Sequence, residues 1–189
     1  MRRRVGVLGS LCNPPHSGHA ALARCAAEQL GLDHVLLIPT GTPAHRPAPA
    51  IDAHTRLRLA QAAAADEPVL EASSLEVDRV GPSFMADTLE QLALAADGAE
   101  LVLLLGADQY ATLDTWHDPA RIRQLATIAV APRAGSAVEV NEEAIALRMP
   151  IVDVSSTEIR RRIAAGEPIA GLVSPGVAAT IAELGLYRA

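Results

Sequence analysis

Two histidines beside a turn rich in glycine and proline, near the start of the chain, could bind phosphate. The turn and the histidines form the run GSLCNPPHSGH at residues 9–19, directly after the apolar stretch Val5 to Leu8. A buried strand that passes through such a turn into a helix presents free backbone N–H groups and the positive end of the helix dipole. His16 and His19 are three residues apart, so both imidazoles lie on one face of the first helical turn. The spacing predicts that both donate hydrogen bonds to one anion.

The same run could also be interpreted as a metal site, because Cys12 lies four residues before His16. A structural zinc ion needs four ligands, usually with a second Cys or His pair. The other cysteine of the chain is Cys25, two helical turns beyond His19. The sequence therefore favours an anion over a metal ion at this turn.

A second predicted helix start offers the same chemistry late in the chain. The run VSSTEIRRR at residues 154–162 follows a predicted strand, Ile151–Val154. Ser155 and Glu158 have the spacing of a capping box, and a capped helix with solvated arginines would explain the run without any ligand. Three hydroxyls together with Arg160, one turn into the helix, also provide donors suited to phosphate. Two such helix starts in one domain would suit a triphosphate. The hydroxyls belong to Ser155, Ser156 and Thr157.

The elements that would position these motifs alternate between short apolar runs and amphipathic segments. Nearly continuous apolar strands separated by helices indicate an α/β fold with a parallel sheet covered on both faces. Ligands of such sheets bind beyond the carboxyl ends of the strands, where the strand order reverses. Gly31 and Gly166 stand where two of the helices are expected to end. The predicted strands are Val5–Leu8, Val35–Ile38, Val69–Ala72, Leu101–Leu105, Ile128–Ala131 and Ile151–Val154. The predicted helices are His19–Leu30, Ala53–Ala65, Ser83–Ala95, Pro119–Leu125 and Thr157–Ala165.

Composition limits the classes of protein that fit this chain. With 189 residues, of which 50% are hydrophobic, we expect one domain spanning residues 1–189. The net charge of −6 argues against nucleic acid and against a membrane surface as partners. The basic start MRRR resembles that of a signal peptide, but the apolar run after it is too short and ends at Gly9. Two cysteines without a pairing pattern indicate a reducing compartment, so we expect a cytoplasmic protein.

Both motifs match signatures of one superfamily. Residues 9–19 resemble the G-G-[ST]-F-[DN]-P-P-H-x-G-H signature of the nucleotidyltransferases with an H-x-G-H or T-x-G-H motif, and residues 155–160 resemble their I-S-S-T-x-I-R motif. Within this superfamily the chain is most similar to the bacterial nicotinate-mononucleotide adenylyltransferases. The segments that carry this likeness span most of the chain: residues 39–47, ending in His45-Arg46-Pro47, and residues 76–89, 106–116 and 173–187.

The resemblance implies a Rossmann-like, doubly wound parallel sheet and the transfer of the adenylyl group of ATP to nicotinate mononucleotide. The products would be deamido-NAD and pyrophosphate, as in NAD biosynthesis. The attacking phosphate is already anionic, so catalysis needs alignment and charge stabilisation rather than a base or a covalent intermediate. Mg²⁺, bound mainly through the ATP phosphates, is the expected cofactor. The family pattern assigns the catalytic roles to His16, His19 and Arg160.

The resemblance also implies two sets of binding residues. The ATP set is Gly9, Ser10, His16, Gly18, His19, Gly106, Asp108, Ser155, Ser156, Thr157 and Arg160. The mononucleotide set is Thr40, His45, Arg46, Phe84, Met85, Trp116 and Arg133. Asp108 would bind a ribose hydroxyl or cap the helix that follows it, and Trp116 would stack on the pyridine ring or lie in the core. Arg133 would bind the acceptor or be a solvated surface cation.

Five residues depart from the family pattern. Ser10, Leu11 and Cys12 stand where the family has Gly, Thr or Ser, and Phe, and Phe84 and Met85 replace Tyr and Thr. The family's Thr helps to hold the pyridine substituent, so the choice between nicotinate and nicotinamide mononucleotide stays open. Phosphopantetheine as the acceptor and a catalytically inactive nucleotide-binding regulator are two further alternatives. The sequence does not decide the oligomeric state, and a homo-oligomer stays open.

Overall fold

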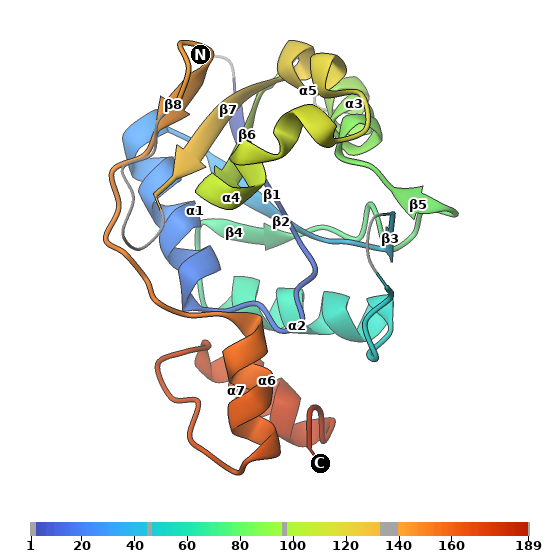
Figure 1. Ribbon diagram of the computed structural model, residues 1–189, viewed down its shortest axis with the longest axis vertical. Helices are drawn as coiled ribbons and strands as arrows, with labels where there is room; N and C mark the ends of the chain where they lie inside the picture. The colour runs from blue at the N-terminus through green and yellow to red at the C-terminus, as the bar shows by residue number, and fades with distance from the viewer. Residues whose placement is uncertain (1–2, 45–46, 96–97, 133–139, 189) are drawn as a thin grey trace.

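A six-stranded parallel sheet forms the centre of the molecule in the computed structural model, which describes residues 3–44, 47–95, 98–132 and 140–188 (Figure 1). The strand order is β4-β2-β1-β6-β7-β8. The strands are β1 Arg4–Ser10, β2 His34–Pro39, β4 Leu70–Ala72, β6 Glu100–Gly106, β7 Ala126–Ala131 and β8 Ala144–Ala146. Two short strands, β3 Thr42–Pro43 and β5 Pro82–Ser83, pair separately.

The strand order reverses next to β1. This strand pairs with β2 on one side, with Val7 opposite Leu36, and with β6 on the other, with Val7 opposite Leu103. The chain runs outward from β1 to β2 and β4, then crosses to β6 and runs outward to β7 and β8. The carboxyl ends of β1 and β6, at Ser10 and Gly106, therefore flank the point where doubly wound sheets bind ligands.

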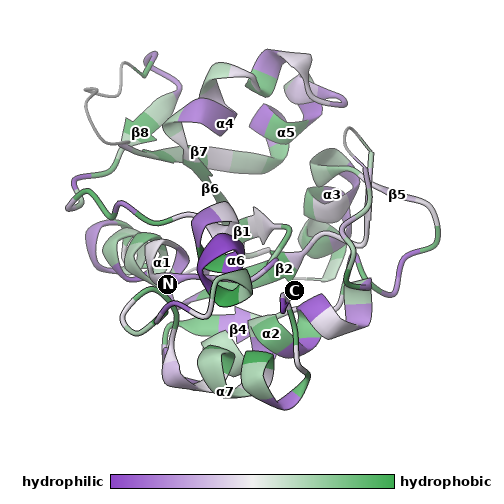
Figure 2. Ribbon diagram, turned by 60° about the horizontal axis from the view of Figure 1, so that its bottom comes forward, coloured by the Kyte–Doolittle hydropathy of each residue, from purple (hydrophilic) through white to green (hydrophobic). Residues whose placement is uncertain are grey.

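Alternate residues of each strand pack into separate cores on the two faces of the sheet. On β6, Val102 and Leu104 join the core that contains Leu22 of the first helix, while Leu103 joins the core that contains Leu89 of the third. Residues of both cores are shielded from water, and Figure 2 shows apolar strands enclosed between helices of mixed hydropathy. The predicted doubly wound α/β fold is confirmed.

The helices cover both faces of the sheet and one end of the molecule. Predicted ends at Gly31 and Gly166 are confirmed, since both glycines have a positive φ, 62° and 70°. A third core joins the second helix to the last two, through Leu59, Ile159 and Ile181. The helices are α1 Ser17–Leu30, α2 Ala53–Ala65, α3 Met85–Ala95, α4 Ala107–Ala111, α5 Pro119–Leu125, α6 Ser156–Ala164 and α7 Pro175–Glu183, with a 3₁₀ turn, η1, at Leu113–Thr115.

One predicted strand is wrong. Residues 151–154 form no strand, and the outermost strand is β8, in which Ile145 pairs with Ala129 of β7. Ile151 is 56% exposed, whereas Val152 and Val154 line a large cavity. The apolar character of this run is therefore explained by a cavity wall rather than by a sheet. In the described part of the chain, no helix has the length and hydrophobicity to cross a membrane.

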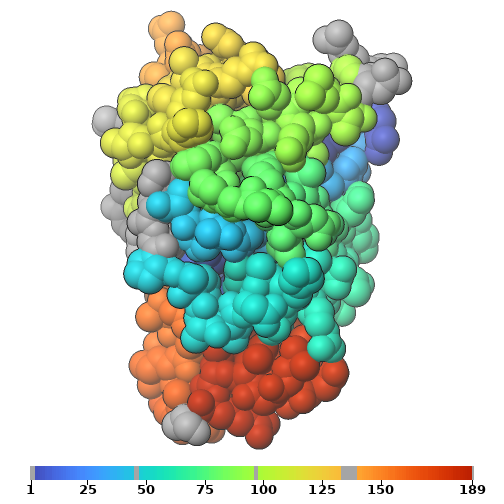
Figure 3. Space-filling view, turned by 90° about the vertical axis from the view of Figure 1, so that its right-hand side faces the viewer, coloured from blue at the N-terminus to red at the C-terminus, as the bar shows by residue number. Residues whose placement is uncertain are grey.

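Segments distant in the sequence meet on the face shown in Figure 3. There the turn after β2 lies against the segment that contains β5, and α7 lies below α2. The pairing of Thr42 with Pro82 and of Pro43 with Ser83 accounts for the first contact. This arrangement brings residues 40–44 and 76–85 to one side of the same cavity.

Candidate active site

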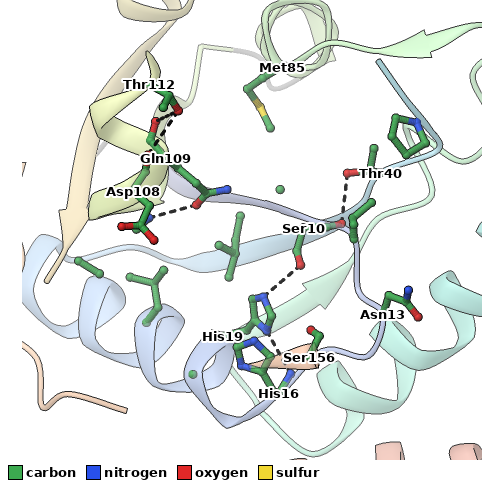
Figure 4. Close-up of a pocket in the computed structure, with 18 of the residues that line it drawn as sticks. Ser10, Asn13, His16, His19, Thr40, Met85, Asp108, Gln109, Thr112 and Ser156 are labelled. Atoms are coloured by element: carbon green, nitrogen blue, oxygen red, sulfur yellow. Dashed lines mark hydrogen bonds between the residues drawn. The ribbon is translucent and has the colours of Figure 1, made fainter. Parts of the chain in front are cut away.

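A cavity of about 960 Å³ opens at the carboxyl ends of β1, β2, β6 and β7 (Figure 4). Among the predicted site residues that the structure describes, Ser155 does not line it. His45, Arg46 and Arg133 lie outside the described residues. The predicted residues that line the cavity are Gly9, Ser10, His16, Gly18, His19, Thr40, Phe84, Met85, Gly106, Asp108, Trp116, Ser156, Thr157 and Arg160.

The two histidines lie at the start of α1 with their ring centroids 3.9 Å apart. His16 is the N-cap residue, and its backbone N–H donates to Nδ1 of His19 over 3.1 Å. Nε2 of His19 is 3.0 Å from the hydroxyl oxygen of Ser10 at the end of β1. Gly18 leaves room for this pair, because a Cβ there would lie 3.0 Å from Nδ1 of His16. The strand and the helix therefore fix both imidazoles against each other at the cavity wall.

Both imidazoles are neutral near pH 7. Burial lowers the pKa of His16 to about 4, and burial together with the neighbouring His16 lowers the pKa of His19 to about 3. Because Nδ1 of His19 accepts a hydrogen bond from a backbone N–H, its single proton belongs on Nε2. The pair therefore offers neutral N–H donors rather than a fixed positive charge.

This burial makes the stability of the protein depend on pH. An unfolded histidine has a pKa of about 6.5, so below that pH the unfolded chain binds protons that the folded chain does not. We expect the free energy of unfolding to fall between about pH 6.5 and pH 5, by up to about 1.4 kcal/mol per pH unit for each such histidine. Urea denaturation across this range measures the slope. The variant His19→Asn should have a smaller slope, and an unchanged slope would contradict the assignment.

The second predicted helix start lies directly against the first turn. Ser156 donates a hydrogen bond to the carbonyl oxygen of Pro14 over 2.8 Å, and Nη1 of Arg160 donates to that of Asn13 over 2.7 Å. Nη2 of Arg160 donates to the hydroxyl oxygen of Thr157 over 3.3 Å. Two segments more than 140 residues apart in the sequence thus form one wall of the cavity.

The predicted capping box at α6 is half correct. Ser155 is the N-cap residue and accepts a hydrogen bond from the backbone N–H of Glu158 over 3.2 Å. The carboxylate of Glu158 instead binds Arg161 and Arg162, each at 2.8 Å, because these cations lie three and four residues further along the same helix. Ser155 therefore orients α6 from outside the cavity lining.

Arg56 is a buried cation that the sequence analysis missed. Its side chain, on α2, is 1% exposed and donates to the carbonyl oxygens of Leu11, Thr40 and Gly41. It thereby ties the turn after β1 to the turn after β2. A signal was present in the sequence, since Arg56 shares its helix face with the buried Leu59, three residues on.

The C-terminal segment also holds the first turn in place. The hydroxyl of Tyr187 donates to Oδ1 of Asn13 over 2.8 Å, and the backbone N–H of Ser17 donates to the carbonyl oxygen of Leu172 over 2.9 Å. Hydrogen bonds from α2, α6 and the C-terminal segment therefore converge on one short turn. Such convergence is what a turn that must hold a fixed shape around a ligand requires.

Sequence comparison with known proteins finds relatives that match the chain over nearly its whole length. The cytidylyltransferase-like family matches residues 8–162. A probable nicotinate-nucleotide adenylyltransferase of Albidiferax ferrireducens is 40% identical, over 98% of each chain. One of Chromobacterium violaceum is 38% identical, over 100% of each chain. The chain belongs to the nicotinate-nucleotide adenylyltransferase family.

Solved structures of similar proteins have the same fold. A putative nicotinate-nucleotide adenylyltransferase from Vibrio parahaemolyticus superposes with a TM-score of 0.73 at 23% identity, covering 98% of this chain and 96% of that chain. The Plasmodium falciparum nicotinic acid mononucleotide adenylyltransferase complexed with NaAD superposes with a TM-score of 0.81 at 12% identity, covering 98% of each chain. The family membership and the Rossmann-like fold predicted from the motifs are both confirmed.

In this nicotinate-nucleotide adenylyltransferase family member, aromatic and apolar side chains line the side of the cavity opposite α6. Trp116 lines the cavity and also packs against the second core, so its position is compatible with both interpretations and its stacking role stays a prediction. The ring of Phe84 lies 4.3 Å from that of His117, a cavity residue that the sequence analysis missed. Met85 reaches the end of β1, where a Cβ on Gly9 would lie 2.6 Å from its methyl carbon. This side of the cavity suits a flat ring.

A buried carboxylate fixes the segment that carries these aromatic residues. Glu76 is 4% exposed and accepts a hydrogen bond from the hydroxyl of Thr88 over 2.8 Å, while Arg79 donates to the same hydroxyl over 3.1 Å. Burial raises the pKa of Glu76 above its ordinary value. The network explains why residues 76–89 form a recognisable motif, since each member needs the others as partners.

Asp108 does not cap a helix. The N-cap residue of α4 is Gly106, whose backbone N–H donates to the side chain of Gln109 over 3.1 Å. Asp108 lies in the first turn of α4 and lines the cavity. The capping interpretation of Asp108 is therefore wrong, and Asp108 is part of the cavity wall beside the end of β6.

Proposed function

We propose that this chain transfers the adenylyl group of ATP to nicotinate mononucleotide, forming deamido-NAD and pyrophosphate. The observation that carries the proposal is that two helix starts with donors suited to phosphate line one cavity. They are His16 to His19 and Ser156 to Arg160. The names of relatives with up to 40% identity over nearly the whole chain support this choice of reaction.

The proposed ATP side of the cavity lies between the two helix starts. Arg160 and the hydroxyls of Ser156 and Thr157 would bind the β- and γ-phosphates, and His16 and His19 would face the α-phosphate. Asp108 would accept a hydrogen bond from a ribose hydroxyl. These assignments are supported by position, because all of these residues line the same cavity.

The proposed reaction is a direct displacement at the α-phosphorus. A phosphate oxygen of the mononucleotide forms the new P–O bond while the bond from the α-phosphorus to the bridging oxygen breaks, and the bond electrons leave with pyrophosphate. The attacking oxygen is already anionic, so no residue needs to remove a proton. The neutral imidazoles then stabilise developing negative charge by hydrogen bonding, which is how preorganised donors accelerate such reactions.

Mg²⁺ is the cofactor that we propose for this reaction. In the described ranges no group of three or more His, Cys, Asp or Glu side chains could hold a metal ion. Asp108 is an acidic residue of the cavity lining, so the residues fit an ion held chiefly by phosphate oxygens and water. Bound in this way, Mg²⁺ would supply neutralisation of phosphate charge.

Removal of Mg²⁺ should therefore affect activity and stability differently. With excess chelator we expect turnover to fall at least roughly 10²-fold, since charge on the transferred group is no longer neutralised. The melting temperature of the ligand-free protein should not change, because no group of three or more His, Cys, Asp or Glu side chains among the described residues could hold the ion. A large drop in melting temperature on chelation would instead indicate a structural metal site.

Trp116 is the proposed stacking partner of the pyridine ring. We expect Trp116→Ala to raise the apparent KM for the mononucleotide roughly tenfold, the loss expected for an aromatic stacking contact and its buried area. The KM for ATP should change by less than about threefold, since the ATP side lies against α6. Steady-state kinetics with each substrate varied in turn measure both values. Equal changes would show that Trp116 acts through the core.

The proposed function is tested by pyrophosphate release with ATP, Mg²⁺ and one of three acceptors: nicotinate mononucleotide, nicotinamide mononucleotide or phosphopantetheine. Preference for nicotinate mononucleotide supports the proposal and shows that Met85 is tolerated. Preference for nicotinamide mononucleotide would support the same reaction with a different acceptor. Phe84 and Met85 would then be the residues to exchange in order to change the specificity. Turnover with phosphopantetheine alone would contradict nicotinate mononucleotide as the acceptor. No turnover from a folded protein that binds ATP would favour a catalytically inactive nucleotide-binding regulator.

We propose the cytoplasm as the compartment, since Cys12 and Cys25 are both free.

A further inference from the structure

A buried guanidinium connects the turns that follow β1 and β2. Nη1 of Arg56 donates a hydrogen bond to the carbonyl oxygen of Leu11 over 3.0 Å and another to that of Thr40. Nη2 donates to the carbonyl oxygen of Gly41 over 2.9 Å. Leu11 and Thr40 line the cavity, whereas Arg56 is 1% exposed and lies outside the lining. Arg56 therefore fixes two parts of the cavity wall without lining the cavity itself.

These hydrogen bonds extend the connection between the two strands beyond the sheet. The parallel pairing of β1 with β2 ends at Ser10, opposite Pro39. Figure 4 shows Thr40 next to this end, where its hydroxyl donates to the carbonyl oxygen of Ser10 over 3.3 Å. Past this point the carbonyl oxygens of Leu11 and Gly41 bind the same guanidinium. A side chain of α2 thus holds the two turns together where strand pairing no longer does.

The turn after β2 passes this connection on to the apolar side of the cavity. The backbone N–H of Gly41 donates to the hydroxyl oxygen of Ser83 over 3.1 Å. A Cβ on Gly41 would lie 2.0 Å from the carbonyl oxygen of Glu76, so the two backbones are in close contact. Ser83 directly precedes Phe84, which lines the side of the cavity that suits a flat ring. Arg56 is therefore linked through Gly41 to the proposed mononucleotide side and through the carbonyl oxygen of Leu11 to the proposed phosphate turn.

The guanidinium sets the spacing between the two turns. It is planar and its N–H groups have fixed directions, so its three carbonyl acceptors must keep fixed relative positions. A buried donor that loses its acceptor costs free energy, and this cost opposes movement of either turn. The helix that carries Arg56 is itself anchored, because Leu59 lies in the third core.

We propose that Arg56 is a positioning residue for the reaction, which aligns the turn that binds the ATP phosphates with the side that binds the mononucleotide. It touches neither substrate. Direct displacement at phosphorus without a base depends on alignment, and a misplacement of about 1 Å can lower the rate roughly 10²-fold. The inference rests on the proposed function for the identity of the two substrates.

Kinetics of two variants separate alignment from charge. Arg56→Lys keeps the charge, but its single nitrogen cannot bind carbonyl oxygens that two separate nitrogens bind in the wild type. We expect kcat to fall roughly 10- to 10²-fold, with each KM changed by less than about threefold, since the contacts to substrate are intact. Arg56→Met, which removes the charge as well, should lose at least as much. Wild-type kcat in Arg56→Lys, or a raised KM with unchanged kcat, would overturn the proposal.

Arg58 provides the matched control on the same helix. It is exposed and binds Glu183 over 3.0 Å, away from both turns. Arg58→Lys and Arg58→Met should therefore have wild-type kcat. Melting temperatures of all four variants show how much folded protein each assay contains. If the Arg56 variants melted earlier but kept wild-type kcat per folded molecule, the role of Arg56 would be structural and the proposal would be wrong.

Hydrogen exchange in the ligand-free protein tests the connection without any substrate. In Arg56→Lys, we expect the amides of residues 11–13 and of residues 40–42 to exchange at least roughly tenfold faster than in the wild type, because both turns lose their common partner. Arg58→Lys should leave both segments unchanged. Faster exchange in one turn alone, or in neither, would overturn the proposal. Absence of turnover with every acceptor would contradict the proposed function, whereas this measurement would still decide whether Arg56 couples the two turns.

Discussion

Replacement of His19 by alanine is expected to lower kcat for dinucleotide formation roughly 10³-fold. The variant removes one of the two imidazoles that we propose to face the α-phosphate, and with it the partner of the Ser10 hydroxyl and the acceptor of the His16 N–H. The ring of His16 also loses its packing partner at 3.9 Å. Turnover at saturating ATP and mononucleotide measures the loss, and circular dichroism checks that the protein is folded.

Two further variants make this result interpretable. His19→Asn retains an acceptor for the backbone N–H at the helix start, so it should fold even if the alanine variant does not, and it should still lose roughly 10²-fold in kcat. His54→Ala is the matched control, because His54 is an exposed histidine in the first turn of α2 and lies outside the cavity lining. Its kcat should equal that of the wild type. A folded His19→Asn protein within tenfold of wild-type kcat would remove His19 from the mechanism.

The sequence was sufficient for features set by local chemistry. The run Val5 to Leu8 followed by residues 9–19 predicted β1, the turn and α1, because apolar length, turn residues and the helix start are all local signals. Helices α2 and α5 were predicted with their observed bounds, since each begins at an Asp that accepts a backbone hydrogen bond, Asp52 or Asp118.

Other features depend on contacts that no local pattern shows. Val152 and Val154 border the cavity, and a strand of the same composition as residues 151–154 would look identical in the sequence. Arg56 binds the carbonyl oxygen of Leu11, 45 residues away, and Tyr187 binds Asn13, 174 residues away. Cys12 occupies the left-handed region, with φ of 51°, which its residue type does not favour. Each of these is fixed by the packing of several elements around one turn.

Arg160→Ala should have the second large effect, a fall in kcat/KM for ATP of roughly 10²- to 10⁴-fold. Two charge-assisted hydrogen bonds to phosphate are worth roughly 1.5 to 3 kcal/mol each, and this arginine is the cation of α6 that lines the described cavity. The variant also removes the donor to the carbonyl oxygen of Asn13. Initial rates with ATP varied at saturating mononucleotide measure the change.

The position next to Arg160 provides a strict control for charge. Arg161 points away from the cavity and binds Glu158 and Glu167, each at 2.8 Å, so Arg161→Ala removes the same charge from the same helix without touching the site. It should leave kcat/KM for ATP unchanged. Arg160→Lys keeps the charge but loses the planar guanidinium, so its kcat/KM for ATP should lie between that of the wild type and that of Arg160→Ala. If Arg161→Ala and Arg160→Ala were equally impaired, the effect would be one of net charge. A loss of kcat/KM that is confined to the Arg160 variants would show that the reaction needs a guanidinium at this position, bound to Asn13 on one side and to substrate phosphate on the other.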